Sequence, residues 1–295
     1  MVGIRQKRRA AVLLLLPFTI LFFVFTILPI LSSVVLSFTS FNMLSAPKFI
    51  GLENYARMLA DDSVFPIAVK NTLIFAVLTG PLGFLMSFVF AWLINELRPR
   101  LRAVLTLLFY APTLAGNVYF VWLFIFSGDA YGLANSTLMK LGILQEPIQW
   151  LTDSRYSMAV VVIVILWLSM GAGFLSLIAG LQNMNSELYE AGAIDGIRNR
   201  WQELWYITVP QMLPQLLFAA VMSISTSFAV GYQSMALTGF PSTDYSAHTL
   251  TLHIYDVGFI RFEMGYASAL AVVLFAAMAF SWRLINRGLS RLSGD

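Results

Sequence analysis

The stretch "NTLIFAVLTGPLGFLMSFVFAWLIN", residues 71–95, contains 25 residues without a charged side chain. An α-helix rises about 1.5 Å per residue, so about 20 mostly apolar residues cross the hydrocarbon core of a bilayer, which is about 30 Å thick. This stretch is therefore long enough to form a membrane-spanning helix.

The same pattern recurs along the whole chain. Only 11% of the residues are charged and 59% are hydrophobic, whereas about 25% charged is typical of a soluble domain. A transmembrane β-barrel would instead show segments of about 10 residues with alternating polarity, and no such alternation is present. The sequence predicts an all-α integral membrane protein with six transmembrane helices, because six charge-free runs reach at least 19 residues: 10–47, 71–95, 103–128, 156–186, 204–243 and 264–282.

We expect a single transmembrane domain over residues 1–295. The first apolar run exceeds the roughly 7–15 residues of a signal-peptide core and has no small-residue cleavage site after it, so we expect it to remain as a span. The predicted spans are 10–38, 66–95, 103–127, 156–182, 210–238 and 264–285, with a cytoplasmic loop at 183–206 between the fourth and the fifth.

The distribution of Lys and Arg predicts the orientation of these spans. If the amino terminus is cytoplasmic, the inside segments hold 12 of the 18 basic residues and the outside segments hold the other six. Cytoplasmic loops carry such an excess, so both termini are expected inside a cytoplasmic membrane of a bacterium or archaeon. The basic residues beside the ends of the spans also account for the pI near 9.2, so no nucleic-acid partner is needed to explain it.

Ionisable residues are missing from the centres of the predicted spans. Ion-coupled carriers and proton pumps usually place such residues there, because they mark ion pathways. The chain has no cysteine and no convincing metal-ligand or catalytic pattern. His248 and His253 share an outer loop and are expected to be solvated surface residues rather than metal ligands. An ion-coupled secondary carrier and an intramembrane enzyme are both disfavoured alternatives, and a transporter of this composition must draw its energy from a partner.

One cytoplasmic segment interrupts the apolar pattern: "YEAGAIDGIRNRWQELWYITVPQMLP", residues 189–214. Its first part predicts a short helix that ends at Asp195-Gly196, because Gly accepts the positive φ that turns require. The spacing of its second part predicts an amphipathic helix, with one face formed by Trp201, Leu204, Trp205 and Thr208. By periodicity alone, this could equally be an interfacial helix pair with its Trp residues among the lipid headgroups.

The residues themselves resemble a known family. Glu190-Ala191, Asp195-Gly196, Pro210 and Pro214 are similar to the "EAA…DG…P…P" loop of permease subunits in ATP-binding-cassette importers. The segments "FTILPILSSVVLSFTSFN" (25–42), "KNTLIF" (70–75), "AGLQNMNSELYEAGAIDG" (179–196) and "GYASALAVVLF" (265–275) resemble carbohydrate permeases of the maltose-transporter type. Gly192 and Ile197 replace the usual alanines, and the interval from Asp195-Gly196 to Pro210 is one residue longer than the commonest form.

The resemblance implies that the loop docks into a cytoplasmic ATPase and couples ATP hydrolysis to movement of the spans. It implies a second permease subunit, two ATPase subunits that bind ATP and magnesium, an extracytoplasmic solute-binding protein and an oligosaccharide as partners, and no cofactor or catalytic residue in this chain. The coupling residues would be Glu190, Ala191, Gly192, Asp195, Gly196, Ile197, Trp201, Leu204 and Pro210.

The fifth predicted span is unusually polar for an uncharged helix, and its hydroxyl and amide groups suit a neutral polyol. Hydrogen bonding between helices is the plainer explanation for any one of these residues, and import of a non-sugar solute is the closest alternative function. The predicted substrate path comprises Trp167, Ser169, Ser223, Thr226, Ser227, Tyr232 and Gln233.

Overall fold

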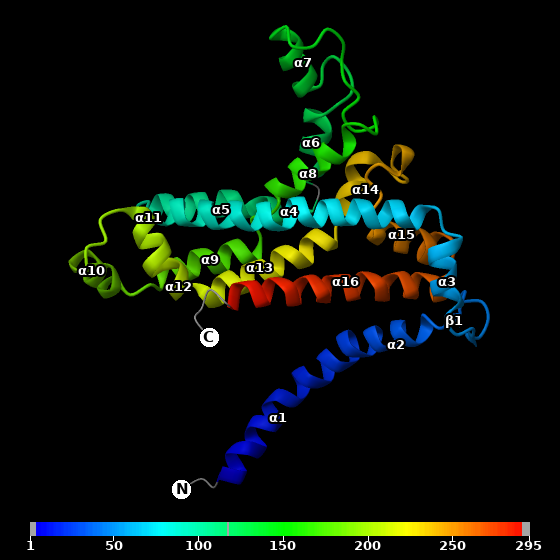
Figure 1. Ribbon diagram of the computed structural model, residues 1–295, viewed down its shortest axis with the longest axis horizontal. Coiled ribbons are helices and arrows are strands. Elements are labelled where there is room, and N and C mark those ends of the chain that lie inside the picture. The colour runs from blue at the N-terminus through cyan, green and yellow to red at the C-terminus, as the bar shows by residue number, and fades with distance from the viewer. Residues whose placement is uncertain (1–3, 117, 291–295) are drawn as a thin grey trace. The chain divides into compact units, whose positions relative to one another are not determined.

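The computed structural model describes residues 4–116 and 118–290, and most of them lie in helices (Figure 1). The chain forms two compact units. The first contains the chain up to Asp62 together with His253–Phe275, and the second contains Ser63–Leu252 together with the chain from Ala276 onward.

Four helical segments are long and apolar enough to cross a bilayer: Val12–Leu36, Val64–Asn95, Ser157–Gln182 and Met264–Arg287. They coincide with the predicted spans one, two, four and six. Two further helix pairs qualify if each is one bent span: Pro99–Leu114 with Tyr119–Ile125, bent by 90°, and Arg200–Gln211 with Leu213–Phe228, bent by 82°. The described chain therefore has four to six apolar spans. The continuous helix predicted for span three is broken between Leu114 and Tyr119. The 82° bend lies at the predicted start of span five, which is interrupted further on, between Leu213–Phe228 and Tyr232–Thr238.

Prolines lie at the two bends. Pro112 is in the last turn of the helix Pro99–Leu114, and Pro214 opens the helix Leu213–Phe228. Proline has no N–H to donate and clashes with the preceding turn, so it favours the end or the start of a helix over its interior. Length and hydropathy alone do not reveal such a break.

The first unit begins with an apolar helical stretch. It consists of α1 (Ile4–Phe22), the π-helical turn η1 (Phe23–Ile27) and α2 (Leu28–Leu36). Large apolar side chains along it are exposed, and Phe25 is 74% exposed. Strand β1 (Thr39–Ser40) follows and pairs antiparallel with β2 (Lys48–Phe49), and α3 (Glu53–Ala60) comes next. Such an apolar surface is suited to contact with lipid tails.

Hydrogen bonds hold this hairpin to its neighbours. The Asn54 side-chain amide donates to the carbonyl oxygens of Ser37 and Thr39, at 2.8 and 3.0 Å. Gly265 lies at the start of α16 (Met264–Ser290), and its N–H donates to the Phe41 carbonyl at 3.0 Å. A Cβ at residue 265 would lie 2.0 Å from the Thr39 oxygen, so this close approach requires glycine.

His253 is buried, at 1% exposure. It lies in α15 (Leu250–Tyr255), which continues into the π-helical turn η4 (Asp256–Ile260). Its Nε2 is 2.7 Å from an oxygen of Asp62, which also accepts a hydrogen bond from the Tyr266 hydroxyl at 2.5 Å. His248, in the second unit, is equally buried. The expectation of two solvated histidines was wrong, because the loop that carries them folds back into helical structure.

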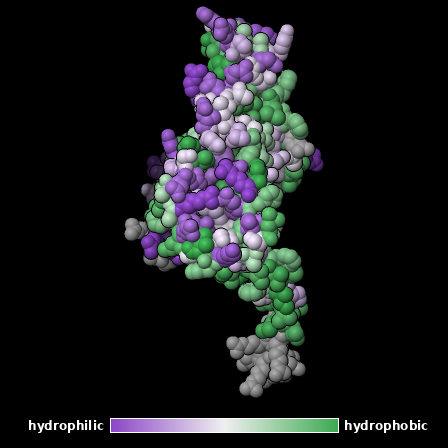
Figure 2. Space-filling model, turned by 90° about the vertical axis from the view of Figure 1, so that its right-hand side faces the viewer, coloured by the Kyte–Doolittle hydropathy of each residue, from purple (hydrophilic) through white to green (hydrophobic). Residues whose placement is uncertain are grey.

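Charged residues of the first unit pair with one another. Arg57 bonds to the carboxylate of Glu263, and this hydrogen bond raises the pKa of Arg57. Arg261 bonds to Asp256. Figure 2 shows hydrophilic side chains gathered on the face that holds α3, with hydrophobic surface beside them. This division is expected where a membrane protein emerges into water.

In the second unit, three helices pack closely: α4 (Val64–Asn95), α9 (Ala172–Gln182) and α13 (Leu213–Phe228). Phe174, Leu177 and Leu216 belong to their shared core. A Cβ at Gly173 would lie 3.2 Å from the Ala219 Cα, so a small residue permits this approach between helices. The helices α5 (Pro99–Leu114), α6 (Tyr119–Ile125), α8 (Ser157–Trp167) and α14 (Tyr232–Thr238) complete most of the unit.

A small lobe with α7 (Leu133–Lys140) lies between α6 and α8 in the chain (Figure 1). Its centre is Asn135, whose side chain is fully buried. The Asn135 amide donates to three backbone carbonyls and accepts from the Ile148 N–H and the Trp150 indole. Since all polar atoms of this side chain are bonded, Asn135 organises the lobe.

Candidate functional site

The predicted coupling loop begins with the helix α10 (Ser186–Ile194). The Asn185 side chain caps it by accepting from the Glu187 N–H at 3.0 Å. At its end, Gly196 has φ +94°, the Ile197 N–H donates to the Gly192 carbonyl, and the Gly196 N–H donates to the Ala193 carbonyl. These two bonds form a Schellman motif, in which glycine occupies the left-handed position. The predicted stop at Asp195-Gly196 is thus present.

The residues of this first helix divide into an exposed set and a packed one. Glu190, Ala191, Asp195 and Gly196 are exposed, and Ile194 is 87% exposed. Their side chains are available to a partner. The turn at Gly196 is also open to a partner, because a Cβ at this residue would have no atom within 4 Å.

Gly192 is buried and has a different role. A Cβ at this position would lie 2.6 Å from Ile207 Cδ1 and 3.1 Å from Ile197 Cδ1. The Tyr189 and Thr208 hydroxyls are 2.9 Å apart and join the same two segments. Gly192 and Ile197 therefore hold the two halves of the loop together, which explains a glycine where alanine is usual.

The second half of the loop has two faces. It consists of α11 (Arg200–Glu203), the π-helical turn η2 (Leu204–Thr208) and α12 (Val209–Gln211). Leu204 and Thr208 are buried at 5% and 2% exposure, whereas Trp201 and Trp205 are both 63% exposed. The four residues predicted to share one face therefore divide into an exposed pair and a buried pair, because Leu204 and Thr208 pack against the protein while the two Trp side chains point outward.

The π-turn accounts for the length of this segment. Its i→i+5 bonds hold one residue more per turn than those of an α-helix. The interval from Asp195-Gly196 to Pro210 is one residue longer than the form it resembles, and η2 lies within that interval. Pro210 itself is exposed.

Side-chain contacts attach the loop to the end of α4. Arg200 bonds to Glu96 at 2.7 Å and to Glu203 at 2.9 Å. The hydrogen bond with Glu203, and then the charge of Glu96, raise the pKa of Arg200. The Trp92 and Trp201 rings lie 5.5 Å apart. A displacement of the loop would therefore be transmitted to α4.

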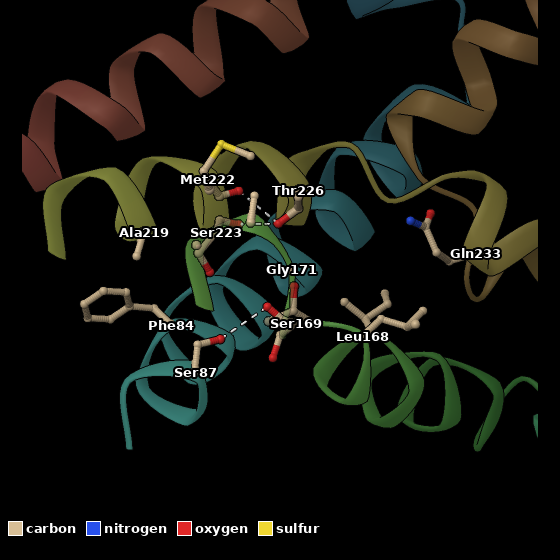
Figure 3. Close-up of a pocket in the computed structure, with 14 residues that line it drawn as sticks. Phe84, Ser87, Leu168, Ser169, Gly171, Ala219, Met222, Ser223, Thr226 and Gln233 are labelled. Carbon is tan, nitrogen blue, oxygen red and sulfur yellow. Dashed lines mark hydrogen bonds between the residues drawn. The ribbon is translucent and has the colours of Figure 1, made fainter. Parts of the chain in front are cut away.

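A cavity of about 740 Å³, including its open mouth, lies among α4, α13 and the break between α8 and α9. In Figure 3, Ser87 of α4 lies beside Ser169, and Ser223 and Thr226 of α13 lie across from them. All lining residues are uncharged: Thr79, Phe84, Ser87, Ile165, Leu168, Ser169, Gly171, Ala172, Gly173, Ala219, Met222, Ser223, Thr226 and Gln233.

Most of the hydroxyls around the cavity bond to the backbone. Ser223 donates to the Gly80 carbonyl at 2.7 Å, and Thr226 donates within its own helix. The Ser87 hydroxyl donates to the Ser169 carbonyl at 3.2 Å. The Ser169 Oγ differs, because it is buried and has no hydrogen-bond partner among the described residues. The described residues therefore leave the hydrogen-bonding capacity of this lining hydroxyl unused.

Three residues of the predicted substrate path do not line this cavity. Ser227 is buried and donates to the Ile224 carbonyl at 2.8 Å. Trp167 packs against Trp122, with ring centroids 5.3 Å apart. Tyr232 is 56% exposed and its ring is 5.7 Å from that of Tyr119. The remaining four, Ser169, Ser223, Thr226 and Gln233, are brought together.

The sequence did not reveal the contribution of α4. Thr79 and Ser87 line the cavity, and Gly83 lies midway between them, with its Cβ position 3.0 Å from Ser169 Cβ. Residues four apart lie on one face of a helix. The spacing of small and polar residues at 79, 83 and 87 was therefore an available signal. Within the described part of the chain, no group of three His, Cys, Asp or Glu side chains could hold a metal ion.

Comparison with known proteins places these features in context. Residues 79–292 match the family described as "Binding-protein-dependent transport system inner membrane component". The chain is 35% identical over 264 residues to the lactose transport system permease protein LacF of Rhizobium radiobacter, covering 87% of this chain and 86% of LacF. It is 30% identical over 271 residues to the arabinooligosaccharides transport system permease protein AraP of Bacillus subtilis (strain 168), covering 91% and 85%.

A solved structure has a similar fold. A chain of the bacterial alginate ABC transporter in complex with an alginate pentasaccharide-bound periplasmic protein aligns with a TM-score of 0.79. The two chains share 22% sequence identity, and the alignment covers 99% of each.

Proposed function

The chain belongs to the family of binding-protein-dependent transport system inner membrane components, and from this premise we propose that it is the membrane-spanning permease of an ATP-driven sugar importer, with oligosaccharides as substrates. Relatives named for lactose and arabinooligosaccharide transport support the sugar class. The uncharged cavity supports it independently, because hydroxyl and backbone groups can pair with a neutral polyol without burying an unpaired charge.

The proposed topology has six spans in one domain: the four long helical segments, the bent pair Pro99–Leu114 with Tyr119–Ile125, and the stretch 210–238 that contains α13 and α14. Both termini are cytoplasmic in a bacterial or archaeal membrane. With this orientation, the cytoplasmic segments hold 12 of the 18 Lys and Arg residues, and such an excess is typical of cytoplasmic loops. The loop 183–206 lies on the cytoplasmic side, and the lobe around α7 lies outside.

The observation that carries the proposed mechanism is the geometry of this loop. Glu190, Ile194 and Asp195 are exposed at a helix end fixed by a Schellman motif. Helix-in-groove recognition uses such an apolar residue with a few polar anchors. The other half of the loop is joined to α4 through Arg200 and Glu96. Docking of an ATPase on the first half would therefore move α4, which lines the cavity.

This mechanism requires partners. Two ATPase subunits would bind ATP and magnesium, so this chain would hydrolyse nothing itself. A second permease would supply the other half of the translocation path, and an extracytoplasmic binding protein would deliver the sugar. Gly192, Ile197 and Leu204 act in this account as packing residues of the loop, and Trp201 and Pro210 position its second half, rather than all touching the ATPase.

Co-purification and ATP hydrolysis test the proposal. A tagged chain, expressed with the products of its neighbouring genes, should retain an ATPase whose hydrolysis rises when sugar-loaded binding protein is added. Glu190→Ala should weaken that retention, while Glu187→Ala, on the same helix, serves as the control. Retention and stimulation that are equal in both variants would remove the coupling role from the exposed face of α10.

A further inference from the structure

The segment Arg200–Gln211 runs at 82° to α13. Membrane-spanning helices are tilted on average by about 20° from the bilayer normal. A segment almost perpendicular to such a helix lies close to the membrane plane. Because it leads directly into α13, it lies at the level where that helix enters the bilayer.

The outward face of this segment is aromatic. Trp205 and Tyr206 are 63% and 73% exposed, whereas Leu204, Ile207 and Thr208 on the other side are buried. Trp and Tyr are enriched where membranes meet water, because each ring is apolar and carries one polar group. Trp201, one turn earlier, contacts Trp92 near the end of α4. The end of α4 therefore lies at the same height along the membrane normal as this segment.

Charge separates the two halves of the loop. The first half, through Gly196, carries Glu187, Glu190 and Asp195 and no basic residue. The second half carries Arg198, Arg200 and Glu203, so its net charge is positive by one, and Arg198 is its basic residue outside the Arg200 ion pairs. The cytoplasmic leaflet is negatively charged and attracts basic residues that lie close to it. Lipid headgroups therefore favour the second half and repel the first.

We propose that Trp205 and Tyr206 anchor the segment Arg200–Gln211 in the cytoplasmic headgroup layer, so that lipid, and not the ATPase, covers this face. The inference rests on the proposed cytoplasmic position of the loop. The anchored segment keeps its depth in the headgroup layer but can turn within that layer. Only the acidic first half projects into the cytoplasm, and its movement reaches α4 through Arg200 and Trp201.

Depth measurements by spin labelling test this inference, and a chain without cysteine suits them. Single cysteines replace Trp205, Tyr206, Leu44 or Val77 in the full chain, which is assembled with its partners in vesicles of phosphatidylethanolamine and phosphatidylglycerol. Collisions with oxygen report lipid, and collisions with a water-soluble nickel complex report water. Val77, exposed on α4, is the hydrocarbon reference, and Leu44, which is 91% exposed, is the aqueous reference.

The labels at 205 and 206 should collide more with oxygen than with nickel, at a depth of about 5–10 Å as expected for an interfacial helix. The label at 44 should show the reverse order. Brominated lipids should quench less of the tryptophan fluorescence in Trp205→Phe than in the unmodified chain. Trp167→Phe, in the packed interior, is the control and should not show this loss of quenching.

Nickel access at both aromatic positions would place this face in water and overturn the inference. Shielding from both reagents, or unchanged lipid quenching in Trp205→Phe, would overturn it in favour of a protein contact. Failure of the coupling role would leave these depths unchanged and would appear instead as normal ATPase retention in Glu190→Ala.

Discussion

Replacement of Gly196 by Val isolates the conformation of the proposed coupling turn. Gly196 has φ +94°, and a Cβ there would meet no atom within 4 Å. The substitution therefore adds backbone strain without a clash. Strain of this kind costs about 1–3 kcal/mol for a residue other than glycine.

If the ATPase binds only the native turn, this cost lowers its affinity by about 5- to 150-fold. The variant should still insert in the membrane. The measurement is the dissociation constant of the ATPase from the purified permease in nanodiscs, followed by hydrolysis with and without sugar-loaded binding protein.

Gly142 provides a matched control. It has φ +71° and equally open space, but it follows α7 in the outer lobe. Gly142→Val should impose similar strain and leave the ATPase affinity unchanged. Equal affinities of Gly196→Val and the unmodified chain would refute the reasoning, and equal losses in both glycine variants would attribute the effect to general destabilisation.

Further substitutions test other parts of the account. Ser169→Ala removes a hydroxyl without a protein partner, so it should preserve thermal stability while reducing transport by about 2- to 10-fold, the value of one hydrogen bond; unchanged transport kinetics would return Ser169 to helix packing. A cysteine at Leu44, which is 91% exposed, should react in intact cells with a membrane-impermeant thiol reagent, whereas one at Ile194 should react only after lysis; the opposite pattern would invert the topology. Asn135→Ala should destabilise the lobe around α7 by at least about 1–3 kcal/mol, because it leaves buried polar groups unpaired. Limited proteolysis should then cleave more rapidly within residues 128–154. Unchanged protection from the protease would contradict the role assigned to Asn135.

The long uncharged runs predicted the helices well, because hydropathy depends on composition over about 20 residues. Four predicted spans coincide with apolar helical segments that are long enough to cross a bilayer. The breaks after Leu114 in span three and after Phe228 in span five were missed; Pro112, near the first of them, is compatible with either a kink or a helix end. The fate of a proline in a membrane helix depends on the neighbours that satisfy the freed backbone groups.

Local turn chemistry was equally predictable. Asp195-Gly196 ends α10 as expected, because the Schellman motif depends on a few adjacent residues. The buried and exposed sides of the following helix were not, because they depend on contacts with other segments, such as the one between the Thr208 and Tyr189 hydroxyls. The burial of His253 beside Asp62 also escaped prediction, since it joins residues 191 positions apart in the sequence.

Vesicle uptake tests the central claim most directly. The assembled complex is reconstituted, and uptake of a labelled oligosaccharide is measured with either ATP at the ATPase side or a proton or sodium gradient as the sole energy source. We predict uptake that requires ATP, the ATPase and the binding protein together, and no uptake by this chain alone under any ion gradient. Gradient-driven uptake by this chain without its partners would contradict the account.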